Sequence, residues 1–437
     1  MNLPAATPSR VIPGKPSAAA RALVDPRWRA RHLLLAPHRL GFFLAMVALV
    51  SAGGWWALVQ LDRVSPALSL PYAVAPSLAH GAVMTFGFLP LFFSGFLFTA
   101  GPTWLGVQPL AARQVLAPLL LQAGGWMMWL IGAHLHGLTA LAGSLLAWLG
   151  LAWVTALFWG LIQRSRAADQ LHARAVGVAC VVGCLSLAGL APSLLLGAPA
   201  VALACILTGL WGFVLVVFVS VAHRIIPCFS SHAVPMLDAW SPSWVLWLML
   251  SAAAVEVAAV WADLGGLPAG SAWTLLRGLF ELASGAMLLW LATAWGLAQS
   301  RKNRLLAMLH VGFFWLGLAL ALGGIAQGLS WLQGAPVLAL GSIHALSMGC
   351  LASLMMAMVT RVSCGRSGRA VVADRLIWSL FWLLQAATLL RLLAAAQGEP
   401  SGWLLLAAAL LWAGIMVVWG LRQASWYGRL RADARPG

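Results

Sequence analysis

The sequence predicts an all-α, polytopic membrane protein with about twelve transmembrane helices. Of its 437 residues, 62% are hydrophobic and only 8% are charged, so polar side chains are too few to cover a water-soluble globule. Apolar runs of about 20 residues, long enough to cross a bilayer as helices, recur along the whole chain. Lys and Arg gather in alternate connections between these runs, as is typical of cytoplasmic loops.

Each apolar run is bounded by charged residues, Pro or Gly. The first six predicted spans are 40–61, 77–101, 114–133, 138–162, 175–196 and 200–226. The next six are 243–262, 271–298, 304–328, 336–360, 375–396 and 402–423. The first run is longer than the apolar core of a signal peptide, so we expect it to stay as a span. The chain therefore divides into a basic N-terminal segment, one membrane domain and a short tail, at 1–39, 40–423 and 424–437.

The distribution of positive charge predicts the orientation of the spans. With the N-terminus in the cytoplasm, all but three of the 26 Lys and Arg residues face the cytoplasm, the exceptions being Arg63, Arg277 and Arg391. An odd number of spans would reverse every later loop and destroy this asymmetry. We therefore predict a multi-pass protein of the bacterial inner membrane with both termini inside. The formal charge of +16 is then explained by the topology of a protein in a lipid bilayer, and it does not indicate nucleic-acid binding.

Several common sequence motifs for disulfides, haem attachment and nucleotide binding are missing. The six Cys form neither CxxC nor CxxCH, which argues against a disulfide framework and against covalently attached haem. There is no GxxxxGK and no GxGxxG that opens a helix, so a nucleotide site is not predicted.

Four histidines lie inside apolar runs, where a coordinating side chain is costly and suggests a functional site. His80 and His344 fall in the outer half of the predicted bundle, and His310 and His223 in the inner half. Residues at similar depth on neighbouring helices can bind one centre, so these form two candidate ligand pairs. His134 and His136 lie in a short outer loop, and we assign no role to His32, His38, His172 or His232.

The outer pair has a distinctive spacing. Met84 and Met348 follow His80 and His344 at i+4, so each Met shares a helical face with its His. Two imidazoles could ligate haem iron, and a mixed His and Met set would suit Cu(I). The alternative is that each His satisfies a backbone carbonyl while each Met fills a gap in the bundle.

Charged residues also occur within two neighbouring spans. Arg277 and Glu281 are spaced i, i+4 on the eighth span, and Glu256 lies on the seventh. An intramembrane ion pair or triad is the simpler interpretation. A proton path or an anion site is the alternative.

Four strings resemble the NnrS family of bacterial membrane proteins. The second span reads HGAVMTFGFLPLFFSGFLFTAGPTWLG from His80, similar to a family segment that opens HAHEM and ends GFLxTAxPxWxG. HRIIPCFS from His223 resembles GGRVIPFFT and carries over Arg224, and LHVGFFW around His310 resembles LHLGYLW. HALSMGCLASLMMAMVTRVSCGRSGR from His344, which contains Arg361, resembles HALTVGAIGTMTLAVMTRVSLGHTGR.

This chain also departs from those strings. It keeps the first His and the Met of HAHEM as His80 and Met84, but has Ala82 and Val83 between them. Arg366 stands where the family's GHTGR has His, and Cys364 lies two residues before it. The chain is therefore similar to a divergent member of the family.

The resemblance implies a membrane protein that binds haem without covalent attachment, and also copper, and that takes part in the response to nitric oxide. It makes His80, His310 and His344 the best ligand candidates, with His223 added by its position. Arg224 and Arg361 are expected in structural or ion-pair roles. Whether the protein is an enzyme stays open, because no electron-entry motif is present.

Two other classes of function remain open from the residues alone. Twelve spans with both termini inside also describe many secondary transporters, which use broken helices near the middle of the membrane. A sensor or assembly protein could use the basic N-terminal segment to contact a partner or anionic lipid.

Overall fold

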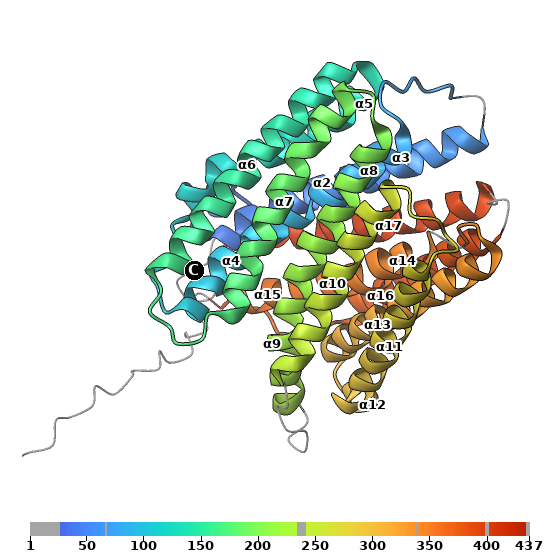
Figure 1. Ribbon diagram of the computed structural model, residues 1–437. Coiled ribbons are helices and arrows are strands. Elements are labelled where there is room, and N and C mark those ends of the chain that lie inside the picture. Colours follow the sequence, from blue (N-terminus) through green and yellow to red (C-terminus); the bar gives the residue numbers. More distant parts are fainter. Residues whose placement is uncertain (1–26, 66–67, 234–241, 338–339, 398–401, 434–437) are drawn as a thin grey trace, which may run out of the picture.

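The computed structural model describes residues 27–65, 68–233, 242–337, 340–397 and 402–433. Much of the predicted N-terminal segment and the last four residues of the tail lie outside these ranges. Within them, every regular element is a helix, and twelve segments are long and apolar enough to cross a membrane (Figure 1). The predicted fold class and the predicted number of spans are confirmed.

The spans follow the predicted order. After a short 3-10 helix, η1 (Ala30–Leu35), the first six spans are α2 (Pro37–Val64), α3 (Pro76–Phe86) with α4 (Leu89–Leu105), η2 (Ala112–Val115) with α5 (Leu116–Leu135), α6 (Gly137–Arg164), α7 (Leu171–Leu195), and α8 (Pro199–Thr208) with η3 (Gly209–Leu215) and α9 (Val216–Ala233). The other six are α10 (Ser243–Leu264), α11 (Ala272–Ala294), α13 (Arg304–Gln333), α14 (Gly341–His344) with η4 (Ala345–Leu351) and α15 (Ala352–Arg366), α16 (Arg375–Ala396) and α17 (Gly402–Tyr427). A short helix, α12 (Leu297–Ser300), precedes α13.

The two ends of the bundle differ in charge. We call the end where α2 begins and α17 stops the basic end, and the opposite end the distal end. At the basic end the backbone N–H of Arg29 donates to the carbonyl of Gly428, which brings the first and last described segments together. The Arg39 guanidinium donates to the carbonyls of Tyr427 and Arg429 at 3.2 and 2.6 Å. That the basic end faces the cytoplasm stays a prediction.

Four spans form the interior of the bundle. The second span is 83% buried over its most apolar window, the ninth and tenth are 72% buried, and the sixth is 67% buried. The other spans reach 56% at most, because one side of each is left for lipid. These four central spans carry His80, His223, His310 and His344, so every candidate ligand from the sequence lies on an interior helix.

Three of the central spans are irregular where the sequence predicts continuous helices. The second span breaks at Gly87 and Phe88, just before Pro90, which has no N–H to donate and restricts the preceding turn. The sixth and tenth spans each contain a π-helical segment, η3 and η4, of a kind that is frequent at functional sites.

The two π segments are packed in a similar way. The Phe86 ring lies where a Cβ on Gly209 would stand, only 2.1 Å from one ring atom. The Trp315 ring occupies the corresponding space at Gly349, 2.4 Å from a built Cβ. A glycine at each π segment thus allows an aromatic side chain from a neighbouring span to lie directly on the backbone.

Candidate functional site

His80 lies near the start of α3, at the distal end. Its ring stacks on that of Trp56 from α2, with centroids 3.8 Å apart and planes 18° apart. Nδ1 of His80 is buried and has no hydrogen-bond partner among the described residues. The guanidinium carbon of Arg63 lies 5.4 Å from the centroid of the same Trp56 ring. The His80 ring is therefore oriented by stacking, and a buried nitrogen is left for a ligand.

His344 ends α14 and directly precedes the π segment η4. Its Nδ1 lies 2.8 Å from the carbonyl oxygen of Leu340. A carbonyl only accepts, so Nδ1 carries the proton and Nε2 keeps its lone pair. Histidines that ligate metals are commonly held in this way, with one ring nitrogen fixed by a backbone carbonyl and the other directed at the metal.

The outer pair lies within electrostatic range. His344, Arg391 and Arg63 are all close enough to affect the His80 ring, and Arg391 is also close enough to affect His344. Both histidines are half-buried, and so are Met84 and Met348, one turn further along each helix. Neither ring is therefore fully enclosed by protein.

His, Cys, Asp and Glu side chains do not by themselves form a metal site in the described part of the chain. Within the described ranges, no group of three or more His, Cys, Asp or Glu is placed to hold a metal ion. Haem iron needs at most two ligands from the protein, because the porphyrin supplies four nitrogens. The His80 and His344 pair fits that requirement, while a copper centre would also need the sulfur of Met84 or Met348.

The inner histidines lie in a different environment. His223 is 3% exposed and His310 is fully buried. Nδ1 of His223 lies 3.0 Å from Nε2 of His172, at the start of α7, and Nε2 of His223 lies 3.1 Å from the carbonyl oxygen of Pro242. Because that carbonyl only accepts, Nε2 of His223 is protonated and Nδ1 accepts from His172. Both nitrogens of His223 are thus used within the protein.

His172 is the partner that the sequence did not suggest. It lies in a polar stretch at the start of α7, and nothing in its local pattern marks it. The rings of His172 and His223 stack with centroids 5.3 Å apart. His223 also contacts Trp295, whose ring packs 4.9 Å from that of Phe313, one turn beyond His310 on α13. The sequence could have predicted this pair from position along the membrane normal, since both histidines lie near the basic end.

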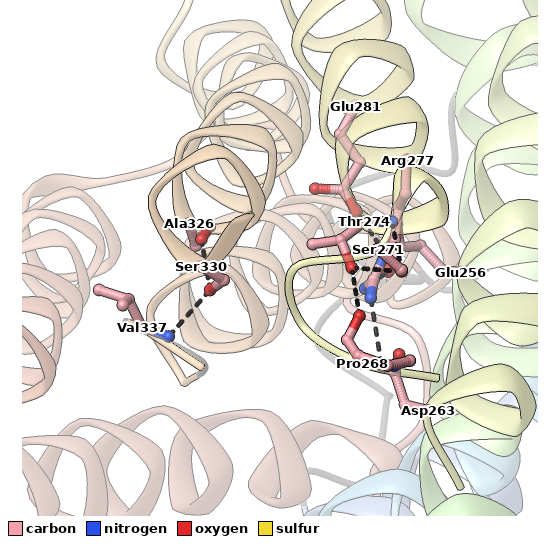
Figure 2. Close-up of polar contacts among 10 residues, drawn as sticks. All are labelled: Glu256, Asp263, Pro268, Ser271, Thr274, Arg277, Glu281, Ala326, Ser330 and Val337. Atoms are coloured by element: carbon pink, nitrogen blue, oxygen red, sulfur yellow. Dashed lines mark hydrogen bonds and ion pairs between the residues drawn. The ribbon is translucent and has the colours of Figure 1, made fainter. Parts of the chain in front are cut away.

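The charged residues of the seventh and eighth spans meet at one point near the distal end (Figure 2). Nε of Arg277 donates to Glu281 at 2.7 Å, and its Nη2 donates to Glu256 at 2.6 Å. A third carboxylate, Asp263, accepts from Nη1 at 3.3 Å. Glu256 and Glu281 are 3% and 2% exposed, and one oxygen of each is buried without a hydrogen-bond partner.

This arrangement has a chemical consequence. Two buried carboxylates and a more exposed third share a single guanidinium, so the cluster would be negative if all three were ionised. Removing one partner of a buried ion pair leaves an uncompensated buried charge, which is strongly destabilising. The guanidinium that the carboxylates share is therefore expected to be essential to the stability of this cluster.

The remaining candidates have structural contacts. Nε2 of His134 accepts from Trp55 at 2.7 Å and its Nδ1 donates to the carbonyl of Pro71 at 2.7 Å, while Nδ1 of His136 accepts from the N–H of Leu138. The Arg224 guanidinium lies 5.4 Å from the centroid of the Trp104 ring. Arg361 lines a cavity at the basic end.

Comparison with known proteins gives a family match. A family model described as NnrS protein matches residues 32–431. No curated protein matches the chain. The matched region runs from η1 to beyond the end of α17 and includes all four central spans. Because the match covers nearly the whole chain, this protein belongs to the NnrS family.

Proposed function

We propose that this protein binds haem between its second and tenth spans, with His80 and His344 as ligands, and that it takes part in the response to nitric oxide in the bacterial inner membrane. One observation carries the proposal. Two half-buried histidines on separate interior helices lie within electrostatic range of each other. Nδ1 of His80 has no hydrogen-bond partner among the described residues, and Nε2 of His344 keeps its lone pair. The nitric oxide role rests on the resemblance to the NnrS family.

The charges around the pair also suit haem. Arg63 and Arg391 both lie within electrostatic range of His80, and Arg391 also lies within range of His344. Haem carries two propionates, and guanidinium groups pair well with carboxylates. We assign Arg63 and Arg391 to hold these groups. Bound haem would supply a redox-active iron, while Trp56 keeps the His80 ring in place by stacking.

Copper is a second cofactor that the same region could take. Met84 and Met348 add thioether sulfurs of the kind that suit Cu(I). Because a three-donor site is not found among the described His, Cys, Asp and Glu residues, copper would depend on these sulfurs. Met84→Leu and Met348→Leu should then lower the copper content and leave the haem content unchanged.

The test is an optical spectrum with metal analysis on purified protein. We expect a Soret band, which His80→Ala and His344→Ala abolish or shift strongly. His136→Ala is the matched control, because that histidine caps a helix at the distal end and should leave the band unchanged. Wild-type protein without haem, or a His344→Ala variant with an unaltered band, would overturn the proposal.

The break in the second span is the one observation that favours the alternative function, a secondary transporter. Proteoliposomes that accumulate a solute while the protein holds no metal would support transport. Haem that depends on His80 and His344 would argue against it.

A further inference from the structure

A cavity of about 470 Å³ lies near the basic end, between the second, sixth and tenth spans. Its lining includes apolar side chains, with Phe96, Met358 and Val362 among them, and cationic ones. Among the described residues, three arginines line it, namely Arg361, Arg366 and Arg431, and no acidic residue does. The cavity lies at the end of the bundle opposite to His80 and His344, so it is a separate site.

The lining comes from the strings that resemble the NnrS family. Phe96, Thr99 and Ala100 belong to GFLFTAGP, Ile225 belongs to HRIIP, and the residues from Met358 to Arg366 belong to MVTRVSCGR. These strings are far apart in the sequence and meet around one space. The strings that resemble the NnrS family therefore line one cavity. This arrangement indicates that they bind a ligand in addition to packing helices together.

The positive charge at this end is only partly compensated. Arg431 is paired with Asp433, through Nε at 2.9 Å and Nη2 at 2.7 Å. Arg39 is 3% exposed, and its hydrogen bonds go to backbone carbonyls. Arg366 also borders a small neighbouring space together with His38 and Arg39. Among the described residues, no carboxylate is seen paired with Arg366 or Arg39.

His38 adds an independent observation. Its side chain is 5% exposed, and its Nδ1 is buried without a hydrogen-bond partner among the described residues. It lines the small neighbouring space together with Arg39 and Arg366. A buried ring nitrogen without a partner beside two arginines is expected where an anion or its hydration shell completes the hydrogen bonding.

The size of the cavity limits the kinds of ligand that it can bind. Small-molecule pockets have volumes of about 300–1,000 Å³, and a single inorganic anion would leave most of this space empty. We propose that the cavity binds an organic anion whose carboxylate or phosphate group lies on Arg361 and Arg366. The apolar part of the ligand then lies against Phe96, Met358 and Val362.

Binding is tested with phenyl phosphate on the purified full-length protein after exchange into lipid-free detergent, by calorimetry or equilibrium dialysis. We expect saturable binding of one equivalent, with inorganic phosphate binding more weakly because it lacks the apolar part. Arg366→Gln should weaken binding about tenfold, the effect of losing one charge-assisted hydrogen bond. Arg366→Lys should retain part of the affinity.

Two further variants test whether weaker binding could come from misfolding instead of loss of the arginine. Val362→Trp fills the apolar side of the cavity without removing charge and should also weaken phenyl phosphate binding. Arg375→Gln is the matched control, since Arg375 is exposed at the same end and does not line the cavity. The haem content should be unchanged in every variant, which separates this result from the test of His80 and His344. Absence of saturable binding in protein that also retains no acidic lipid would overturn the proposal. Wild-type affinity in both Arg366→Gln and Val362→Trp would overturn it as well.

The source of the anion is settled by lipid analysis of the same preparations. An acidic lipid retained by the wild type and Arg375→Gln, but lost from Arg366→Gln, would identify a membrane lipid as the ligand. Phenyl phosphate binding without a retained lipid would identify a soluble organic anion. Both outcomes support the site.

Discussion

Nε2 of His172 lies 3.0 Å from Nδ1 of His223, so two histidines separated by 51 positions form a direct hydrogen bond between the fifth and sixth spans. The sequence paired His223 with His310 because both lie near the same depth. In the structure, His223 is instead held by His172 and by the carbonyl of Pro242. The inner histidines are buried and the outer pair is half-buried, which favours the outer pair as the ligand site.

His172→Phe should destabilise the protein without loss of haem. The substitution leaves Nδ1 of His223 buried without its donor, which costs about 1–3 kcal/mol. Thermal unfolding in detergent measures the loss of stability, and the Soret absorbance measures haem. If His172→Phe removed haem while the protein stayed folded, the ligands would have to be assigned to the inner histidines.

Arg277→Met should be among the most destabilising substitutions in the membrane domain. It leaves Glu256 and Glu281 buried without their cation, and breaking a buried ion pair in this way costs about 3–5 kcal/mol. Adding Glu281→Gln to Arg277→Met should restore part of the stability, because it removes one uncompensated charge. Equal stability of the single and double variants would show that the carboxyls are already neutral.

Trp56→Leu should weaken haem retention. The stacked Trp56 ring fixes the orientation of His80, and contacts of this kind are worth about 0.5–1.5 kcal/mol, or roughly a threefold to tenfold change in affinity. Trp403→Leu is the control, because that side chain is 71% exposed. Haem transfer to an acceptor protein gives the relative affinities, and identical transfer from both variants would exclude a role for the stack.

The link between α16 and α17 should weaken in acid. Burial tends to raise the pKa of Asp374, but hydrogen bonds from Arg422 and from the N–H of Ile377 outweigh it, so the pKa lies below its usual value. The carboxylate therefore stabilises the folded state above the pKa of the unfolded chain. This stability is lost as the pH falls through the folded pKa.

Asp374→Asn should keep the helix cap but lose the ion pair, so its Tm should fall less than that of the wild type between neutral and acidic pH. The pair is partly exposed, so the difference should stay below about 1 kcal/mol. A variant whose Tm followed the wild type throughout would show that the ion pair has no effect on stability.

Gly349→Ala should disturb the tenth span next to His344. A methyl group there would lie 2.4 Å from an atom of the Trp315 ring, within the π segment, and overpacking of this kind costs about 1–3 kcal/mol. Gly414→Ala is the matched control, since nothing lies within 4 Å of its built Cβ. We expect a lower Tm and lower haem content for Gly349→Ala only. Similar values for both variants would contradict the packing argument.

The sequence by itself determined the fold class, the twelve spans and most of their ends. A bilayer requires every backbone polar group to be satisfied within the protein, so a long apolar run has almost no alternative to a helix. The same reasoning selected His80 and His344, because a polar side chain in an apolar run is rarely placed without a role. Arg277, Glu256 and Glu281 were found together for the same reason.

The tertiary structure alone decided which helices lie inside the bundle and which side chains meet there. Lipid-facing and protein-facing surfaces are both apolar, so hydropathy does not distinguish a central span from a peripheral one. The two π segments, the partner of His223 and the cavity lined by Arg361 and Arg366 all depend on contacts between distant spans. Such contacts have no local signature in the sequence, because each one is set by the shape of the neighbouring helix.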